Sequence, residues 1–192
     1  MQDIAIIGYD SGWGCLDWGC EDGPSAIDVT AIRSGLLAQG VKLASCEALE
    51  LKALGAHDQI KNKKQALPLV IESLNRLERK VKEALERNQI PVVIGGDHSS
   101  AIGTWSAIVS HYKAETNFGL IWLDAHLDAH TPTTSHQGKW GGWWHGMPVA
   151  ALTGHGVPEF VTLGSPKPKL APAHISMLGI RSFEWGEKTF VK

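Results

Sequence analysis

The sequence predicts an α/β fold, a three-layer α/β/α sandwich with a mostly parallel sheet. Short apolar segments alternate along the chain with longer segments that carry one apolar face. This β-α-β order is typical of a parallel sheet covered by helices. Gly, Asp and His residues follow two of the apolar segments. Open α/β sheets place their ligand sites at the carboxyl ends of strands, so the fold class also predicts where the function lies.

The expected elements begin with Ile4–Gly8, a short apolar run that ends in glycine and is typical of a strand. Pro24 is expected to open a helix that runs to about Ala38, because proline suits the first helical turn. Val41–Ala44 has the pattern of a weaker strand, and Gly55–Lys64 is a polar connection.

Lys64–Asn88 gives the clearest helical pattern, because apolar residues recur on one face at intervals of three to four. They are Leu67, Val70, Leu74, Leu77, Val81 and Leu85. The charged opposite face is typical of a solvated helix surface. Pro91–Ile94 is the next expected strand, and a helix from about Ser100 to Tyr112 follows it.

The last third of the chain begins with Gly119–Leu123, an apolar run that predicts a buried parallel strand. A long loop over Thr131–Trp144 comes next. Gly156–Pro172 is rich in proline and is expected to be a surface connection. His174–Ile180 is the last expected strand.

Length and composition narrow the functional classes. The 192 residues suffice for one domain with a sizeable core, and 43% hydrophobic with 20% charged residues is ordinary for a soluble protein. A net charge of −2 gives no reason to expect nucleic acid or an anionic membrane as a partner, and no apolar stretch is long enough to span a bilayer. The N-terminus lacks the features of a signal peptide, and three cysteines without a framework spacing predict a cytoplasmic protein.

Metal-ligand residue types follow two expected strands. Residues 95–99 read Gly-Gly-Asp-His-Ser, and residues 124–128 read Asp-Ala-His-Leu-Asp. Alternate residues of an extended chain point the same way, so the side chains at 124, 126 and 128 can converge. Imidazole mixed with several carboxylates suits Mn²⁺ and other divalent first-row metals better than structural Zn²⁺. The predicted ligands are His98, Asp124, His126 and Asp128.

Each of these histidines also has a structural interpretation. A histidine after a strand is more often a satisfied structural residue than a ligand, although two such motifs at successive strand ends favour a metal site. His145 begins a His-Gly-Met-Pro stretch beyond the expected metal site, where it could transfer protons. Alternatively, it marks the start of a helix over Met147–Leu152. His130 and His136 lie in the preceding loop, and either could touch a substrate.

Together, these motifs resemble those of the ureohydrolase family, which includes arginases, agmatinases, guanidinobutyrases and formimidoylglutamases. Residues 95–99 match the family's first metal motif, and residues 124–128 match its second. Residues 145–148 look like the arginase-type stretch that carries a catalytic histidine. Residues 21–24 resemble the family's opening loop, and residues 177–181 resemble the strand before its third motif. The resemblance covers nearly the whole chain.

The resemblance implies a binuclear manganese hydrolase. His98 and Asp128 would hold one ion, His126 the other, and Asp124 would bridge both. A hydroxide shared by two Mn²⁺ ions would attack the guanidinium carbon of the substrate, and collapse would release urea and an amine. His145 would shuttle protons, and Asp128 is expected to serve catalysis as well as metal binding. The ligand types also suit other divalent metals.

The sequence departs from the family pattern in its last third. The third family motif supplies two more aspartates, whereas this chain has no aspartate after Asp128. Glu159, Glu184 and Glu187 remain, but none has the expected motif context. We therefore expect residues 1–192 to form a single arginase-like domain that is incomplete at the C-terminus, with an exposed apolar sheet edge.

Three functional interpretations follow. The first is a manganese-dependent amidinohydrolase. The second is a truncated, non-catalytic family member, or a subunit that needs another chain to complete its metal site. The third is an unrelated mononuclear metal-binding protein, which would require His98 to lie far from Asp124.

The substrate is expected to be a small guanidino compound. Arginases usually present an asparagine shortly after the second motif, and His130 occupies that place here. His130 and Ser135, the latter from an arginase-like stretch, are the expected substrate-binding residues. Arginine, converted to ornithine and urea, is the expected substrate; an agmatinase-type or guanidinobutyrase-type substrate is the alternative. The resemblance also implies a role in arginine metabolism and a homo-oligomer, either a trimer or a hexamer.

Overall fold

The structure is a computed structural model that describes residues 2–15, 17–112, 119–134 and 143–189. Its strands are β1 (Ile4–Tyr9), β2 (Leu43–Ala48), β3 (Ile90–Gly95), β4 (Leu120–Leu123) and β5 (Ile175–Leu178). Its α-helices are α1 (Val29–Ala38), α2 (Lys63–Glu86), α3 (Ser100–Tyr112), α4 (Pro148–Leu152) and α5 (Pro158–Thr162). Short 3₁₀ turns cover Trp18–Asp22, Pro24–Ala26, Leu51–Leu54, His57–Gln59, Trp144–Gly146, Pro172–His174 and Glu187–Thr189.

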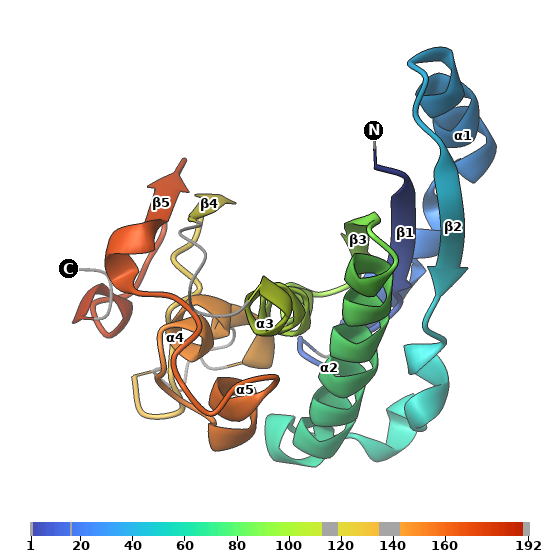
Figure 1. Ribbon diagram of the computed structural model, residues 1–192. Helices are drawn as coiled ribbons and strands as arrows, with labels where there is room; N and C mark the ends of the chain where they lie inside the picture. Colours follow the sequence, from blue (N-terminus) through green and yellow to red (C-terminus); the bar gives the residue numbers. More distant parts are fainter. Residues whose placement is uncertain (1, 16, 113–118, 135–142, 190–192) are drawn as a thin grey trace.

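The strands form two parallel sheets that stand apart (Figure 1). In the first sheet, β1 lies between β2 and β3, and in the second sheet β4 pairs with β5. The α/β class and the parallel pairing expected from the β-α-β alternation are therefore confirmed. β3 and β4 follow one another in the chain and are joined through α3, yet they do not pair.

The main core lies where α2 packs against α3 and β1. The apolar face predicted for α2 is buried: Val70, Leu74, Leu77 and Val81 are each no more than 1% exposed. The helix begins after Asn62, whose side chain accepts a hydrogen bond from the Gln65 amide at 3.1 Å and so caps the first turn. A second core joins β4 to α4 through residues that include Leu120, Trp122, Val149 and Leu152.

Two sequence predictions need correction. The helix expected from Pro24 begins at Val29, because the Asp28 side chain caps it by accepting the Ala31 amide at 3.0 Å; residues 24–26 form a 3₁₀ turn. The expected surface connection over residues 156–172 contains α5, in which Phe160 is 1% exposed. Proline often marks loops, but Pro158 occupies the first turn of a helix, where its missing amide hydrogen is not needed. Among the described residues, none of the helices combines the length and apolar character that a membrane span requires.

The close packing of α3 on α2 predicts opposite effects for two glycine substitutions. A Cβ at Gly103 would lie 3.0 Å from the Leu74 carbonyl oxygen, whereas a Cβ at Gly35 in α1 would meet nothing within 4 Å. We expect Gly35→Ala to raise the free energy of unfolding by about 0.5–1 kcal/mol through helix propensity. Overpacking of about 1–3 kcal/mol should make Gly103→Ala destabilising. Urea unfolding followed by circular dichroism measures both, and equal stabilisation by the two would contradict the tight contact.

The buried Lys169 predicts a pH-dependent stability. Its Nζ donates to the carbonyl oxygens of Phe160 and Val161, and burial lowers its pKa from 10.5 to about 8. Between these values the unfolded chain binds more protons at this group than the folded chain, so its contribution to stability grows as the pH rises. We expect the free energy of unfolding, relative to that of Lys169→Met, to increase by about 1–2 kcal/mol from pH 7 to pH 10. Parallel pH curves for the two proteins would count against a buried ammonium group.

Candidate metal centre

Three of the predicted ligand residues meet at the carboxyl ends of β3 and β4. His98 Nδ1 lies 2.7 Å from Asp128 Oδ2 and 3.1 Å from Asp124 Oδ2. One ligand atom from each residue lies within 4.8 Å of the others, a spacing that a single cation can bridge. Because His98 lies close to Asp124, the two motifs contribute to one site. This contradicts the third interpretation, an unrelated mononuclear protein, which requires these residues to lie far apart.

The loop after β3 is held by the carboxylate of Asp97, which is 4% exposed. Its Oδ1 accepts the Ser99 amide and its Oδ2 accepts the Gly14 amide, both at 2.9 Å. Burial raises the pKa of Asp97, against the opposing effect of these hydrogen bonds. A Cβ at Gly14 would come within 2.3 Å of Asp97 Oδ1, so this close approach requires glycine. Asp97 therefore fixes the turn that presents His98.

The second motif is not extended, and the geometry predicted for it is wrong. Residues 125 and 126 form a bend, and Asp128 adopts a left-handed backbone conformation with φ of 46°. Asp124 Oδ1 accepts the amide of His126 at 2.9 Å, an Asx turn that reverses the local chain direction. Asp124 and Asp128 therefore converge through a turn. The side chain of His126 is 61% exposed and is not part of the three-residue cluster; its role as a ligand stays a prediction.

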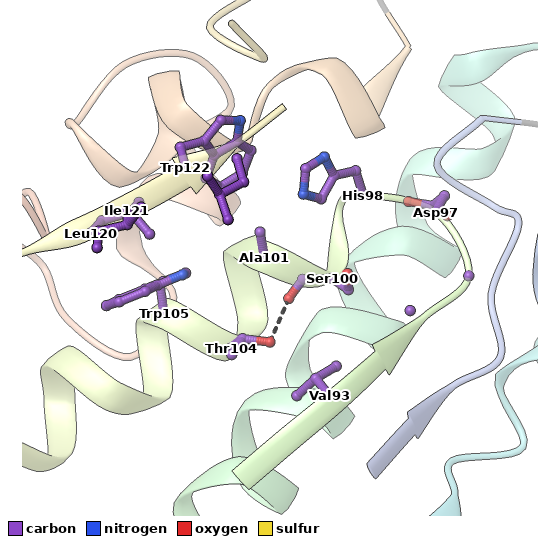
Figure 2. A pocket seen from close by; sticks show the side chains of 13 residues that line it. Val93, Asp97, His98, Ser100, Ala101, Thr104, Trp105, Leu120, Ile121 and Trp122 are labelled. Atoms are coloured by element: carbon purple, nitrogen blue, oxygen red, sulfur yellow. Dashed lines mark hydrogen bonds between the residues drawn. The ribbon is translucent and has the colours of Figure 1, made fainter. Parts of the chain in front are cut away.

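His98 is held between an aromatic ring and two carboxylates. Its imidazole stacks on Trp122, with centroids 4.6 Å apart and planes inclined by 20° (Figure 2). Burial lowers the pKa of His98, but the hydrogen bond and charge of Asp128 and the charge of Asp124 outweigh it, so the pKa is raised overall. Without a cation, a proton on His98 would offset part of the negative charge of the two facing carboxylates. A divalent cation would take over that task and displace the proton.

A pocket of about 550 Å³ opens over the cluster. Its ionisable lining comprises the four carboxylates Asp124, Asp128, Glu184 and Glu187 and the four imidazoles His98, His126, His130 and His145. The structure therefore places every described residue that was predicted for the site at one pocket. Ser135, the other predicted substrate contact, and His136 lie outside the described residues.

His145 lies on the wall of this pocket, next to the first loop. Its amide donates to the Gly14 carbonyl oxygen at 3.2 Å, and its ring Nδ1 is also 3.2 Å from that oxygen. The residue belongs to the 3₁₀ turn that precedes α4. His145 therefore precedes a helix, as its structural interpretation predicts. Its imidazole also lines the pocket, as a role in proton transfer requires.

Glu184 and Glu187 are pocket residues, although the sequence alone gives them no motif context. Glu187 is 4% exposed, and its Oε2 lies 3.3 Å from Nε2 of the buried His130. Its Oε1 accepts the amide of Ala129 at 3.2 Å, and its Oε2 accepts the amide of Glu184 at 2.8 Å. These contacts fold residues 184–187 across the second motif. The available signal was their position after β5, because the carboxyl end of that strand lies beside the end of β4.

Comparison with known proteins identifies a matching family and similar solved structures. The sequence model described as the Arginase family matches residues 2–192. The arginase of Bacillus caldovelox is 35% identical over 193 residues, which cover 100% of this chain and 62% of that protein. The crystal structure of the arginase from Bacillus cereus superimposes with a TM-score of 0.81 at 31% identity, covering 100% of this chain and 61% of that one. The chain thus spans about three fifths of the length of these relatives.

The carboxylates around His98 predict a measurable titration in the metal-free protein. The NMR pKa of His98 should lie above the ordinary 6.5. Asp128→Asn should lower it, because the substitution removes the charge nearest the imidazole. Asp58→Asn, in the 3₁₀ turn His57–Gln59 outside the pocket, serves as the control and should leave it unchanged. An identical His98 pKa in the wild type and Asp128→Asn would contradict the pairing.

Proposed function

This chain belongs to the arginase family, and from this premise we propose that it is a metal-dependent amidinohydrolase that acts on a small guanidino substrate. The observation that carries the proposal is the cluster of His98, Asp124 and Asp128 beneath an acidic pocket. The proposed reaction converts arginine to ornithine and urea. The same premise leads us to propose a cytoplasmic homo-oligomer, a trimer or a hexamer.

The residues of the cluster fit a divalent cation. One imidazole nitrogen and two carboxylate oxygens lie close enough to share an ion, and this donor set suits Mn²⁺. We propose two Mn²⁺ ions, with His98 and Asp128 at the first, His126 at the second and Asp124 serving both. When bound, such ions supply a hydroxide nucleophile near neutral pH by lowering the pKa of water.

The side chains of the pocket supply binding and proton transfer. The carboxylates of Asp124, Asp128, Glu184 and Glu187 favour a cationic guanidinium group over a neutral one. The Nδ1 of His145 faces the Gly14 carbonyl, so a proton on Nδ1 can be donated there and Nε2 left to exchange protons with the pocket. Hydrolysis needs that exchange, because the leaving amine must be protonated as the tetrahedral carbon collapses to urea.

The set of aspartates in this sequence favours one alternative to this function. The 192 residues match 62% of the Bacillus caldovelox arginase, and no aspartate follows Asp128 in this sequence. The alternative is therefore a family member that binds metal but needs further polypeptide for turnover. Agmatine is the substrate against which arginine is compared, because it carries the same guanidinium group but lacks the carboxylate of arginine.

A combined metal and activity measurement tests the proposal. We expect the chelator-treated chain to take up Mn²⁺, measured by calorimetry, and to release urea from arginine faster than from agmatine. Asp124→Asn and Asp128→Asn should each weaken Mn²⁺ affinity more than about 100-fold. This loss of affinity exceeds the one expected for a residue that only orients a ligand. Asp58→Asn is the matched control. Binding without urea would favour the alternative, and no binding by the wild type would reject both.

A further inference from the structure

Two of the three cysteines meet in the first loop, which follows β1. The sulfur atoms of Cys15 and Cys20 are 3.7 Å apart, and both residues are free and partly exposed. Their neighbours Asp17 and Gly19 are exposed. Neither cysteine lines the pocket over the metal-ligand cluster. A small oxidant can therefore reach the two sulfur atoms from solvent.

The backbone of the first loop holds the two sulfur atoms close together. The Cys15 amide donates to the Gly12 carbonyl oxygen at 3.2 Å, which forms one turn. The Cys20 amide donates to the Asp17 carbonyl oxygen, also at 3.2 Å, which forms the next turn. A Cβ at Gly12 would lie 2.5 Å from that Asp17 oxygen, so the two turns are in close contact. The proximity of the thiols therefore follows from the hydrogen bonds and packing of the loop.

The distance between the sulfur atoms is short enough for a bond to form by a local movement. A disulfide has an S–S length of about 2.05 Å, so Cys15 Sγ and Cys20 Sγ must approach by roughly 1.7 Å. Rotations of the two side chains about their Cα–Cβ bonds can supply a movement of this size.

The surroundings of the two thiols give them different reactivity. Burial raises the pKa of both thiols, and more so at Cys15, where the charge of Asp97 adds to the effect. The Cys15 thiol donates to Cys20 Sγ, and this hydrogen bond opposes the rise in the pKa of Cys20. The thiolate is the nucleophilic form of cysteine. Cys20 is therefore the thiol that attacks an oxidant first, and Cys15 stands ready to resolve the product.

We propose that Cys15 and Cys20 form a site of reversible oxidative modification, at which a peroxide converts the two thiols into a disulfide. The Cys20 sulfur attacks one oxygen of hydrogen peroxide, the O–O bond breaks, and a sulfenic acid and water result. The Cys15 sulfur then attacks Cys20 Sγ, so that the S–S bond forms, the S–O bond breaks and a second water leaves. The two thiols give up two electrons and two protons, and the peroxide is reduced. Exchange with a small dithiol reverses the bond.

The first loop connects this cysteine pair to the candidate metal centre. Gly14, next to Cys15, donates its amide to Asp97 Oδ2 at 2.9 Å. Its carbonyl oxygen accepts the amide of His145 at 3.2 Å. A disulfide that draws Cys15 toward Cys20 is therefore expected to alter the contacts of Gly14 with both partners. An effect on proton transfer by His145 rests on the proposed function, whereas the disulfide itself does not.

Peptide mapping of the full 192-residue chain tests the bond directly. Cleavage before Asp17 places Cys15 and Cys20 on separate pieces that only a disulfide holds together. After exposure to hydrogen peroxide, we expect the pieces to stay linked in the monomeric chain and to separate after treatment with dithiothreitol. A link to Cys46, a bond between chains only, or sulfinic acids without any link would each overturn the proposal.

Three serine variants test the order of the two steps. Cys46→Ser removes the partly exposed cysteine of β2, keeps the pair, and should form the disulfide as the wild type does. Cys15→Ser leaves Cys20 without a resolving thiol, so dimedone, which traps sulfenic acids, should label it. Cys20→Ser leaves the less acidic thiol and should be labelled at least about tenfold more slowly. Faster labelling of Cys20→Ser than of Cys15→Ser would overturn the order. Circular dichroism checks that each variant is folded, and the wild-type mapping needs no variant.

NMR of the oxidised chain tests the link to the pocket. The amide signals of Gly14 and His145 should shift when the disulfide forms and return with dithiothreitol. The amide of Asp124, which donates to the Leu178 carbonyl oxygen, is the internal reference and should change little. Unshifted Gly14 and His145 signals in a chain that carries the disulfide would overturn the link.

The outcomes also separate this inference from the proposed function, because neither mapping nor NMR depends on turnover. A chain that forms the disulfide but releases no urea supports the oxidative site and counts against the enzyme. Urea release by a chain whose Cys15 and Cys20 never join overturns the oxidative site and leaves the enzyme.

Discussion

The candidate site depends on one buried carboxylate. Asp97 accepts amides from its own turn, at Ser99, and from a distant loop, at Gly14. The same Gly14 accepts the amide of His145 through its carbonyl oxygen, so a chain of contacts runs from the end of β3 through the first loop to the pocket wall. A buried carboxylate without these partners would cost several kcal/mol. The geometry that directs His98 outward and the position of His145 are consequently linked.

Helix α3 is the spacer between the two strand ends. Its Ile102 and Ala107 belong to the core shared with α2, while Ala101 and Trp105 pack toward the core of β4 and β5. Because one rigid helix contributes to both cores, it sets the relative position of the sheets even though β3 and β4 exchange no backbone hydrogen bonds. The short distance from His98 to Asp124 follows from this packing.

The sequence made the strand ends predictable, because parallel strands deliver the residues after them to a common edge. This logic located His98, Asp124 and Asp128 without any structure. It did not predict the local geometry of the second motif, because the Asp124 side chain accepts the His126 amide and turns the chain away from the extended form. It also could not place Glu184 and Glu187 at the pocket, because the approach of this segment depends on contacts of Glu187 with His130 and Ala129 that no local pattern encodes. The split into two sheets was equally invisible, since β-α-β periodicity fixes strand direction but not which strands are adjacent.

The left-handed backbone at Asp128 restricts which amino acids evolution can place there. Aspartate, asparagine and glycine visit this conformation readily, whereas β-branched and most longer side chains are penalised. Of the three tolerated residues, aspartate alone carries a formal negative charge. Glutamate, an obvious chemical substitute for a ligand, would pay a conformational penalty before its longer side chain reached the cluster. The position is therefore constrained twice, by chemistry and by backbone shape, and neutral drift at it should be far narrower than at the exposed His126.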